Sequence, residues 1–141
     1  MSSGRATLAL QVPGTIDAIQ PATVQAEAWL VEQQVSFEAM YLVSLAIEEL
    51  VTNCIKYGYT DSNRHTIDFL LSVSEGTLRL DVIDDGSPFN PLEAPRPDLS
   101  LPPEKRPIGG LGLHLLRELA DEMNYERKDG TNRLSLTKRM S

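Results

Sequence analysis

The sequence predicts an α+β two-layer sandwich, in which a mixed, mostly antiparallel sheet carries helices on one face. Three observations lead to this prediction. Short segments of alternating apolar and polar residues indicate strands, longer segments with apolar residues three and four apart indicate helices, and tight turns join several strands. Strands joined by short turns pair antiparallel, and helices with one apolar face bury that face against the sheet.

The first half of the chain predicts one strand followed by two helices. Residues 6–12 form the expected strand, and residues 15–34 have a helical pattern that Pro21 either interrupts or opens. The strongest helical pattern covers residues 37–57, with Gly58 as a stop signal. Its apolar positions recur at spacings of three and four: Met40, Val43, Ile47, Leu50 and Cys54.

The second half predicts two hairpins on either side of one helix. Glu75-Gly76 and Asp129-Gly130 are turn dipeptides of the kind that joins hairpin strands. The elements are strands at 66–73 and 78–82, a helix at 110–121, and strands at 125–128 and 133–137.

Prolines are concentrated in one segment. Seven of the nine prolines fall between Gly86 and Ile108, where the lost N–H donors and fixed φ exclude a central strand or an ordinary helix. Loops of this length are typically lids or binding loops. We therefore expect a single domain over residues 1–141, with a lid loop at about 86–108.

Composition excludes several classes of protein. A chain of 141 residues with a net charge of −7 is a poor candidate for binding nucleic acid through its phosphates. The single cysteine, Cys54, excludes an intramolecular disulfide, and with only two histidines the chain cannot supply a His/Cys zinc site. No segment has the apolar length of a signal peptide core or a membrane span, so we expect a cytoplasmic protein without membrane contact.

The first chemical motif is a carboxylate and an amide four residues apart. Glu49 and Asn53 lie on the same face of the predicted helix, next to apolar neighbours. Mg²⁺ prefers oxygen ligands and needs few of them from protein when phosphates supply the rest. Taken alone, the pair is more typical of the solvated edge of an amphipathic helix than of a metal site.

The second motif follows a predicted strand. Asp84 is placed to accept a hydrogen bond from an exocyclic amine such as that of adenine, and Gly86 permits a sharp turn and a close approach of a ligand. An Asp-Gly turn that merely ends a strand is the simpler interpretation. The simple turn does not account for the long proline-rich loop that follows.

The third motif is a glycine run that opens a helix. Gly109, Gly110, Leu111, Gly112 and Leu113 can turn backbone N–H groups and a helix N-terminus toward an anion. The run is neither a Walker P-loop nor a Rossmann fingerprint, and alone it is equally typical of a hinge.

Two basic residues, Lys105 and Arg106, precede the glycine run. Either could cover a terminal phosphate, although surface solubility is the simpler explanation for each of them.

Together, in this order, the three motifs resemble the GHKL ATPase superfamily, which has the Bergerat or histidine kinase-like ATPase fold. The nearest likeness is to the small anti-sigma-factor serine/threonine kinases, over residues 6–138. In that family the glutamate matching Glu49 is the proposed general base, and the asparagine matching Asn53 binds Mg²⁺. The aspartate matching Asp84, within the box Asp84-x-Gly86-x-Pro88, hydrogen-bonds the adenine amine.

The resemblance also implies that the glycine run matching Gly110–Leu113 binds phosphates. Where the family often has a histidine one turn after the asparagine, this chain has Tyr57. The implied function is an ATP- and Mg²⁺-dependent serine/threonine kinase that phosphorylates a small anti-anti-sigma, STAS-domain partner. The family also binds a sigma factor and tends to form homodimers.

Two other functions are compatible with the motifs. The chain could be a nucleotide-gated binding module with little or no kinase activity, or an ATPase without a protein acceptor. The presence of both Glu49 and Asn53 favours an active enzyme, and the absence of an evident water-positioning group disfavours the plain ATPase.

Overall fold

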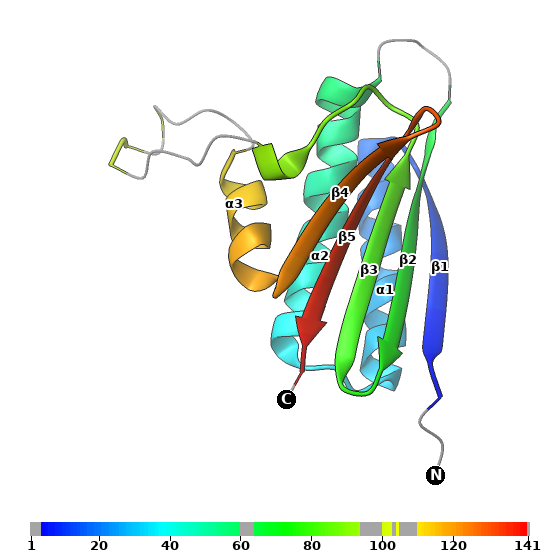
Figure 1. The fold of residues 1–141 in the computed structure, drawn as a ribbon. Helices are drawn as coiled ribbons and strands as arrows, with labels where there is room; N and C mark the ends of the chain where they lie inside the picture. The colour runs from blue at the N-terminus through cyan, green and yellow to red at the C-terminus, as the bar shows by residue number, and fades with distance from the viewer. Residues whose placement is uncertain (1–3, 60–63, 94–99, 103, 105–109, 141) are drawn as a thin grey trace.

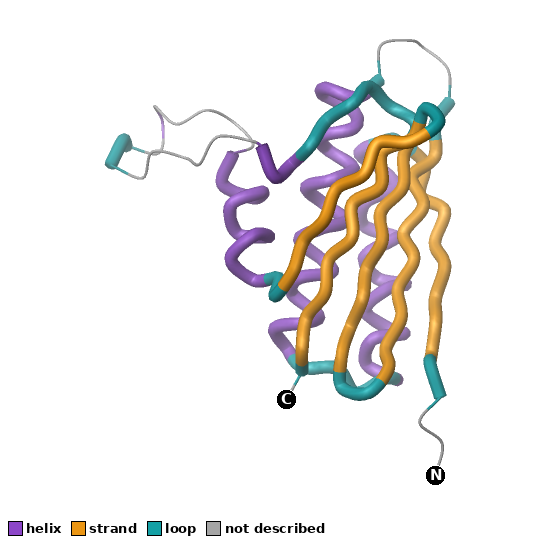
Figure 2. Tube along the Cα trace, viewed as in Figure 1, coloured by secondary structure: helices purple, strands orange, loops and turns teal. Residues whose placement is uncertain are grey.

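A computed structural model of the chain describes residues 4–59, 64–93, 100–102, 104 and 110–140. One five-stranded sheet is covered on one face by helices (Figures 1 and 2). The strands are β1 (Ala6–Pro13), β2 (Thr66–Ser74), β3 (Thr77–Asp84), β4 (Glu122–Lys128) and β5 (Thr131–Arg139). The helices are α1 (Ile19–Glu32), α2 (Phe37–Asn53) and α3 (Gly110–Leu119). The predicted α+β two-layer architecture is confirmed.

The strand order is β1-β2-β3-β5-β4, and all four pairings among the described strands are antiparallel. The sheet is thus antiparallel where the sequence suggested a mixed one. Two connections explain the difference. β1 and β2 are joined through two helices rather than one, so the chain reverses direction before it pairs. β3 and β4 do run parallel, but β5 lies between them.

The two predicted hairpins are present, and their turns have the expected backbone. Glu75 and Gly76 have φ values of 50° and 75°, and Asp129 and Gly130 have values of 51° and 79°. Consecutive left-handed residues match the right-handed twist of paired strands, which explains the preference for glycine at the second position.

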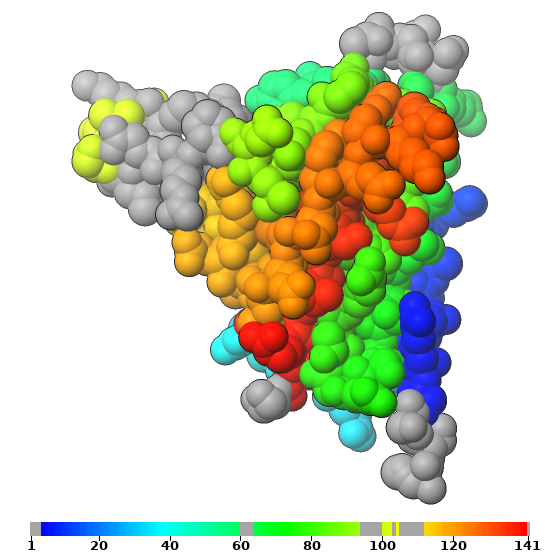
Figure 3. Space-filling model, viewed as in Figure 1, coloured from blue at the N-terminus to red at the C-terminus, as the bar shows by residue number. Residues whose placement is uncertain are grey.

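The core lies between the sheet and the helices. Phe69, Leu71 and Leu80 of the sheet are almost completely buried, as are Leu30 of α1 and Ile47 of α2. The opposite face of the sheet is at the molecular surface in Figure 3, where the strand segments are in view. No helix in the described part of the chain has the length and apolar character needed to cross a bilayer.

All three helices differ from the sequence prediction at one or both ends. A 3₁₀ turn at Ile16–Ala18 precedes α1, so Pro21 falls in the first turn of the helix, where its missing N–H costs no intrahelical bond. The helix predicted to reach residue 57 changes from α to π geometry at Cys54–Gly58. The last helix ends at Leu119 rather than 121, and β4 already begins at Glu122.

Candidate functional site

A pocket opens between the C-terminal end of α2 and the ends of β3 and β5. Asn53 from α2, Cys54 from the π-helical turn, Asp84 from β3 and Asn132 from β5 all line it. It measures about 420 Å³ including its open mouth.

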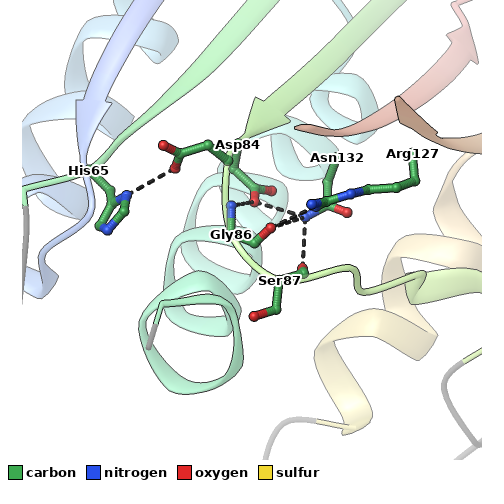
Figure 4. A network of polar contacts seen from close by, with 7 residues as sticks. His65, Asp84, Gly86, Ser87, Arg127 and Asn132 are labelled. Atoms are coloured by element: carbon green, nitrogen blue, oxygen red, sulfur yellow. Dashed lines mark hydrogen bonds and ion pairs between the residues drawn. The ribbon is translucent and has the colours of Figure 1, made fainter. Parts of the chain in front are cut away.

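The Asp84 carboxylate is fixed by hydrogen bonds from two sides. The backbone N–H of Gly86 donates to Asp84 Oδ1 at 2.8 Å, and Asn132 Nδ2 donates to the same oxygen at 3.0 Å (Figure 4). A carboxylate held in this way can accept a hydrogen bond from an exocyclic amine at a low cost in conformational entropy, because its orientation is already set.

Asn132, which the sequence did not single out, organises the loop beyond Asp84. Its side chain is 6% exposed. Its Nδ2 also donates to Ser87 O at 2.9 Å, while its Oδ1 accepts from Phe89 N at 3.4 Å and from the Tyr125 hydroxyl. One buried amide therefore holds the start of the predicted lid in place. The register places Asn132 opposite Asp84, a pairing that only the assembled sheet creates.

Arg127 of β4 is a second residue that the sequence did not indicate. Its Nη1 donates to Gly86 O at 2.6 Å (Figure 4). No local sequence pattern indicates this contact, because β4 is far from Gly86 in sequence. The order of the strands at the sheet edge brings the two together.

The two sides of the pocket touch through glycines. Ser87 N donates to Gly58 O at 2.7 Å, and a Cβ on Gly86 would lie 2.9 Å from Gly58 O and 3.0 Å from Gly58 C and Cα. Gly86 therefore has a packing role in addition to its turn. This contact joins the end of the α2 segment to the strand-end aspartate and sets the separation of Asn53 and Asp84.

We expect Gly86→Ala to destabilise the protein by about 1–3 kcal/mol, because the new methyl meets backbone that cannot rotate away. Gly58→Ala is the matched control on the same contact, since its Cβ would lie at ordinary distances of 3.7–3.8 Å from its neighbours. Urea unfolding of both variants measures the difference. Equal stability of the two would contradict the close packing of these glycines.

Glu49 lies against the start of α3. A Cβ built on Gly112 would overlap the Glu49 carboxylate, so the glycine leaves room for this carboxylate against α3. The pKa of Glu49 is raised above its ordinary value of 4.5, first by burial and then by the neighbouring Glu48 charge, with Lys56 opposing. A carboxylate with a raised pKa is a stronger base than an exposed one.

Asn53 presents an unsatisfied polar group. It is 6% exposed, and its Nδ2 has no hydrogen-bond partner among the described residues. A buried amide left unpaired costs free energy, which a ligand at the pocket could recover. Rotating the amide exchanges its nitrogen and oxygen and would turn the oxygen to the same position.

The donor set suits a magnesium ion bound mainly by phosphates. Among the described residues no three His, Cys, Asp or Glu side chains are grouped closely enough to hold a metal. Mg²⁺ in nucleotide sites needs only one or two protein oxygens besides phosphate and water. The Asn53 amide is therefore sufficient protein ligation for an ion that arrives with a nucleotide.

A thiol and a phenol with raised pKa values lie close to Asp84. Burial, together with the adjacent Asp84 charge, raises the pKa of the Cys54 thiol, and burial and the neighbouring Cys54 raise that of the Tyr59 hydroxyl. Tyr59 stacks on His65 at a centroid separation of 3.9 Å, and His65 Nδ1 lies 3.0 Å from Asp85 Oδ1. These contacts fix the outer side of the Asp84 turn.

Tyr57, at the position where the family resemblance leads us to expect a histidine, stacks on Phe89. The ring centroids are 6.3 Å apart and the planes differ by 22°. Phe89 itself lines the pocket. Tyr57 thus packs against a side chain of the pocket wall.

The remaining predicted residues lie in several places. Pro88 is exposed on the loop after Asp84, and Leu113 is buried in the core. Gly110 and Leu111 are the first two residues of α3. Lys105, Arg106 and Gly109 lie outside the described residues, as do residues 94–99, 103 and 105–108 of the lid at 86–108. Its described first part contains a 3₁₀ turn at Pro91–Glu93, where Leu92 O accepts from Arg117 Nη1 at 3.3 Å.

Replacing Asn132 by alanine should destabilise the protein by about 2–4 kcal/mol, because several buried groups lose their partners at once. It should also weaken binding of adenine nucleotide, since the Asp84 carboxylate and the loop at Phe89 lose their anchor. Thermal unfolding and calorimetric titration measure the two effects. Asn124→Ala, on an exposed position of β4, is the matched control. Unchanged stability of Asn132→Ala would contradict this role.

Comparison with known proteins identifies the family of the chain and proteins with a similar fold. A family model described as "Histidine kinase-like ATPase domain" matches residues 12–138. The chain is 28% identical over 141 residues to serine/threonine-protein kinase BtrW of Bordetella bronchiseptica, covering 97% of this chain and 95% of that one. It is 24% identical over 121 residues to an anti-sigma F factor of Clostridium perfringens, covering 85% and 86% of the two chains.

Among solved structures, the fold resembles a crystal structure of RsbU and RsbW domains from Mycobacterium tuberculosis. The TM-score is 0.67 at 22% identity, and the match covers 96% of this chain and 32% of the other. At this identity the likeness concerns the fold. The family match spans nearly all of the pocket and sheet described above, and the chain belongs to the histidine kinase-like ATPase domain family.

Proposed function

We propose that this chain is an ATP-dependent serine/threonine protein kinase that regulates a sigma factor by phosphorylating a small anti-anti-sigma, STAS-like partner. The observation that carries the proposal is the grouping at one end of α2. Asn53 and Asp84 line one pocket, while one helical turn away the Glu49 carboxylate lies against Gly112 of α3. The kinase and anti-sigma names of similar proteins support the same function.

Each group has a distinct role in this proposal. The adenine amine donates to the Asp84 carboxylate, and the start of α3 at Gly110–Gly112 offers backbone N–H groups to the phosphates. Asn53 would hold Mg²⁺, and the ion would supply charge that offsets the charge developing on the phosphates. Glu49 accepts the proton of the incoming serine or threonine hydroxyl.

Part of the predicted lid forms a wall of the pocket. Phe89 and the buried Pro91 belong to the segment that begins the lid, and both line the pocket. We therefore expect nucleotide binding to be coupled to the position of this segment.

A direct transfer assay tests the proposal. The purified chain is incubated with Mg²⁺, γ-labelled ATP and a purified STAS-domain protein from the same organism, and the label on the partner is followed over time. The account predicts label on a serine or threonine of the partner. Nucleotide-dependent binding of the partner without label would instead support the nucleotide-gated binding module. Release of free phosphate without label on the partner would support the plain ATPase.

A sigma factor as a second partner and a homodimer as the assembly remain expectations from family resemblance. Sedimentation of the purified chain, alone and with each candidate partner, measures both.

A further inference from the structure

The first fifty residues of the fold contain no positive charge. From Ala6 to Ile55 the sequence has six acidic residues and not a single Lys or Arg, whereas 13 basic residues occur elsewhere in the chain. This stretch comprises β1, α1 and α2. Both helices lie on the same side of the sheet (Figure 1), and the charged residues that they place on their outward surface are all acidic.

The same surface is unusually apolar. α1 buries Ala22, Ala26 and Leu30 against the core. Its opposite side carries Val24 and Val31, which are 57% and 63% exposed, with Ala28 between them on the same stripe. A helix that is apolar on both sides is typical of a helix covered on both sides.

α2 continues this pattern at its N-terminal end. Phe37 is 82% exposed and Tyr41, one turn later on the same side, is 44% exposed. The inward side of α2 packs in the core through Leu42, Val43 and Ala46. We call the outward residues Val24, Ala28, Val31, Phe37 and Tyr41 the helix surface. It is far along α2 from Asn53, and none of its residues lines the nucleotide pocket.

Acidic side chains surround the helix surface. Glu27 and Glu32 lie on α1, and neither forms an ion pair with a described residue. Glu38 on α2 lies 3.4 Å from Lys138 of β5. An apolar stripe with unpaired carboxylates at its edge is complementary to a helix that has apolar residues on one face and Lys or Arg beside them.

From this complementarity we propose that the helix surface is a docking site for a basic amphipathic helix of a partner protein. A second copy of this chain is a poorer occupant, because a two-fold contact through these helices would bring like charges together. The site lies apart from the nucleotide pocket, so the proposal does not depend on kinase activity.

The test uses an 18-residue synthetic helix with leucines on one face and lysines on the other, and a matched peptide in which glutamates replace the lysines. Neither peptide contains tryptophan, so the fluorescence of Trp29 on α1, the only tryptophan of the chain, reports binding. We expect the lysine peptide to bind the full chain saturably and the glutamate peptide not to bind. Two variants should each weaken binding at least tenfold: Val31→Ser/Phe37→Ser and Glu27→Lys/Glu32→Lys.

The matched control places the same charge change on another element. Glu122→Lys/Glu126→Lys alters two exposed positions of β4 and should bind the lysine peptide as the parent chain does. Equal loss of affinity in this control would overturn the proposal, because attraction would then reflect net charge rather than a site. Equal binding of both peptides, or no binding of the lysine peptide, would also overturn it. So would a concentration-dependent dimer that Val31→Ser/Phe37→Ser abolishes, since the occupant would then be a second copy.

Discussion

Replacing Glu49 with glutamine should lower the rate of phosphoryl transfer by about 10²–10⁴-fold while leaving ATP affinity within a factor of two or three of the parent. The size of the loss is that of a positioned general base. Affinity is retained because the amide has the same shape, and in the proposed mechanism the adenine is bound by Asp84. Single-turnover transfer and calorimetric titration measure the two quantities. Transfer at the parent rate would exclude Glu49 as the base.

The same variant should be more stable than the parent at neutral pH. The fold raises the pKa of Glu49 above 4.5, so the folded chain holds that proton more tightly than the unfolded chain does. The contribution of Glu49 to the free energy of unfolding is therefore lost as pH rises through its pKa in the folded chain. Glutamine does not ionise, so the variant does not undergo this loss. Melting temperatures of parent and variant should differ at pH 7–8 and converge at low pH, where the carboxyl is protonated in both states.

Activity should have the opposite pH dependence to this stability contribution. Only the ionised Glu49 accepts a proton, so the transfer rate should rise with pH through the same raised pKa. A transfer rate that does not change with pH across that range would show that phosphoryl transfer does not depend on the ionisation of Glu49. A lower melting temperature for Glu49→Gln than for the parent at pH 7–8 would contradict the burial of an ionised carboxylate against Gly112.

Changing Asp84 to asparagine should weaken binding of adenine nucleotides by about 10- to 150-fold, the range expected for losing a hydrogen bond to a charged group. The substitution leaves one oxygen to accept from Gly86 N, which the Asp84 carboxylate now accepts at 2.8 Å. It replaces the other oxygen with a donor that repels an exocyclic amine. Fold stability should therefore change little while affinity falls, as calorimetry and thermal unfolding would show.

Asp84→Ala separates the two roles of this residue. Alanine removes the partner of both Gly86 N and Asn132 Nδ2, so it should lower stability as well as affinity. Asp85→Asn is the neighbouring control, because Asp85 is exposed and pairs with His65 outside the pocket. Unchanged nucleotide affinity in both Asp84 variants would show that the adenine binds elsewhere.

Local patterns were sufficient to predict most of the fold. Alternation along residues 66–73 and 78–82, with Glu75-Gly76 between them, identifies a hairpin because each of these signals acts within a few residues. Local patterns do not predict the insertion of β5 between β3 and β4. It depends on which strand of the last hairpin pairs with β3. That choice arises from packing across the whole sheet, and no residue near Gly130 encodes it locally.

The residues of the candidate site also fall into two groups: those that local sequence patterns indicate, and those that only strand pairing brings to the site. Glu49, Asn53, Asp84 and the glycine run were found because each has a distinctive residue type at a distinctive spacing. Asn132 and Arg127 were missed because an asparagine just after a turn and an arginine just before it are common surface residues. They become part of the site only when β5 pairs with β3 and brings Asn132 opposite Asp84.

The proposed convergence of these groups on one adenine nucleotide is tested most directly by a crystal structure of the chain with Mg²⁺ and a non-hydrolysable ATP analogue. The account predicts the adenine amine within hydrogen-bond distance of the Asp84 carboxylate, the metal on the Asn53 amide oxygen, and the phosphates at the start of α3 near Glu49. An analogue bound away from Asp84, with Asn53 still unligated, would contradict it.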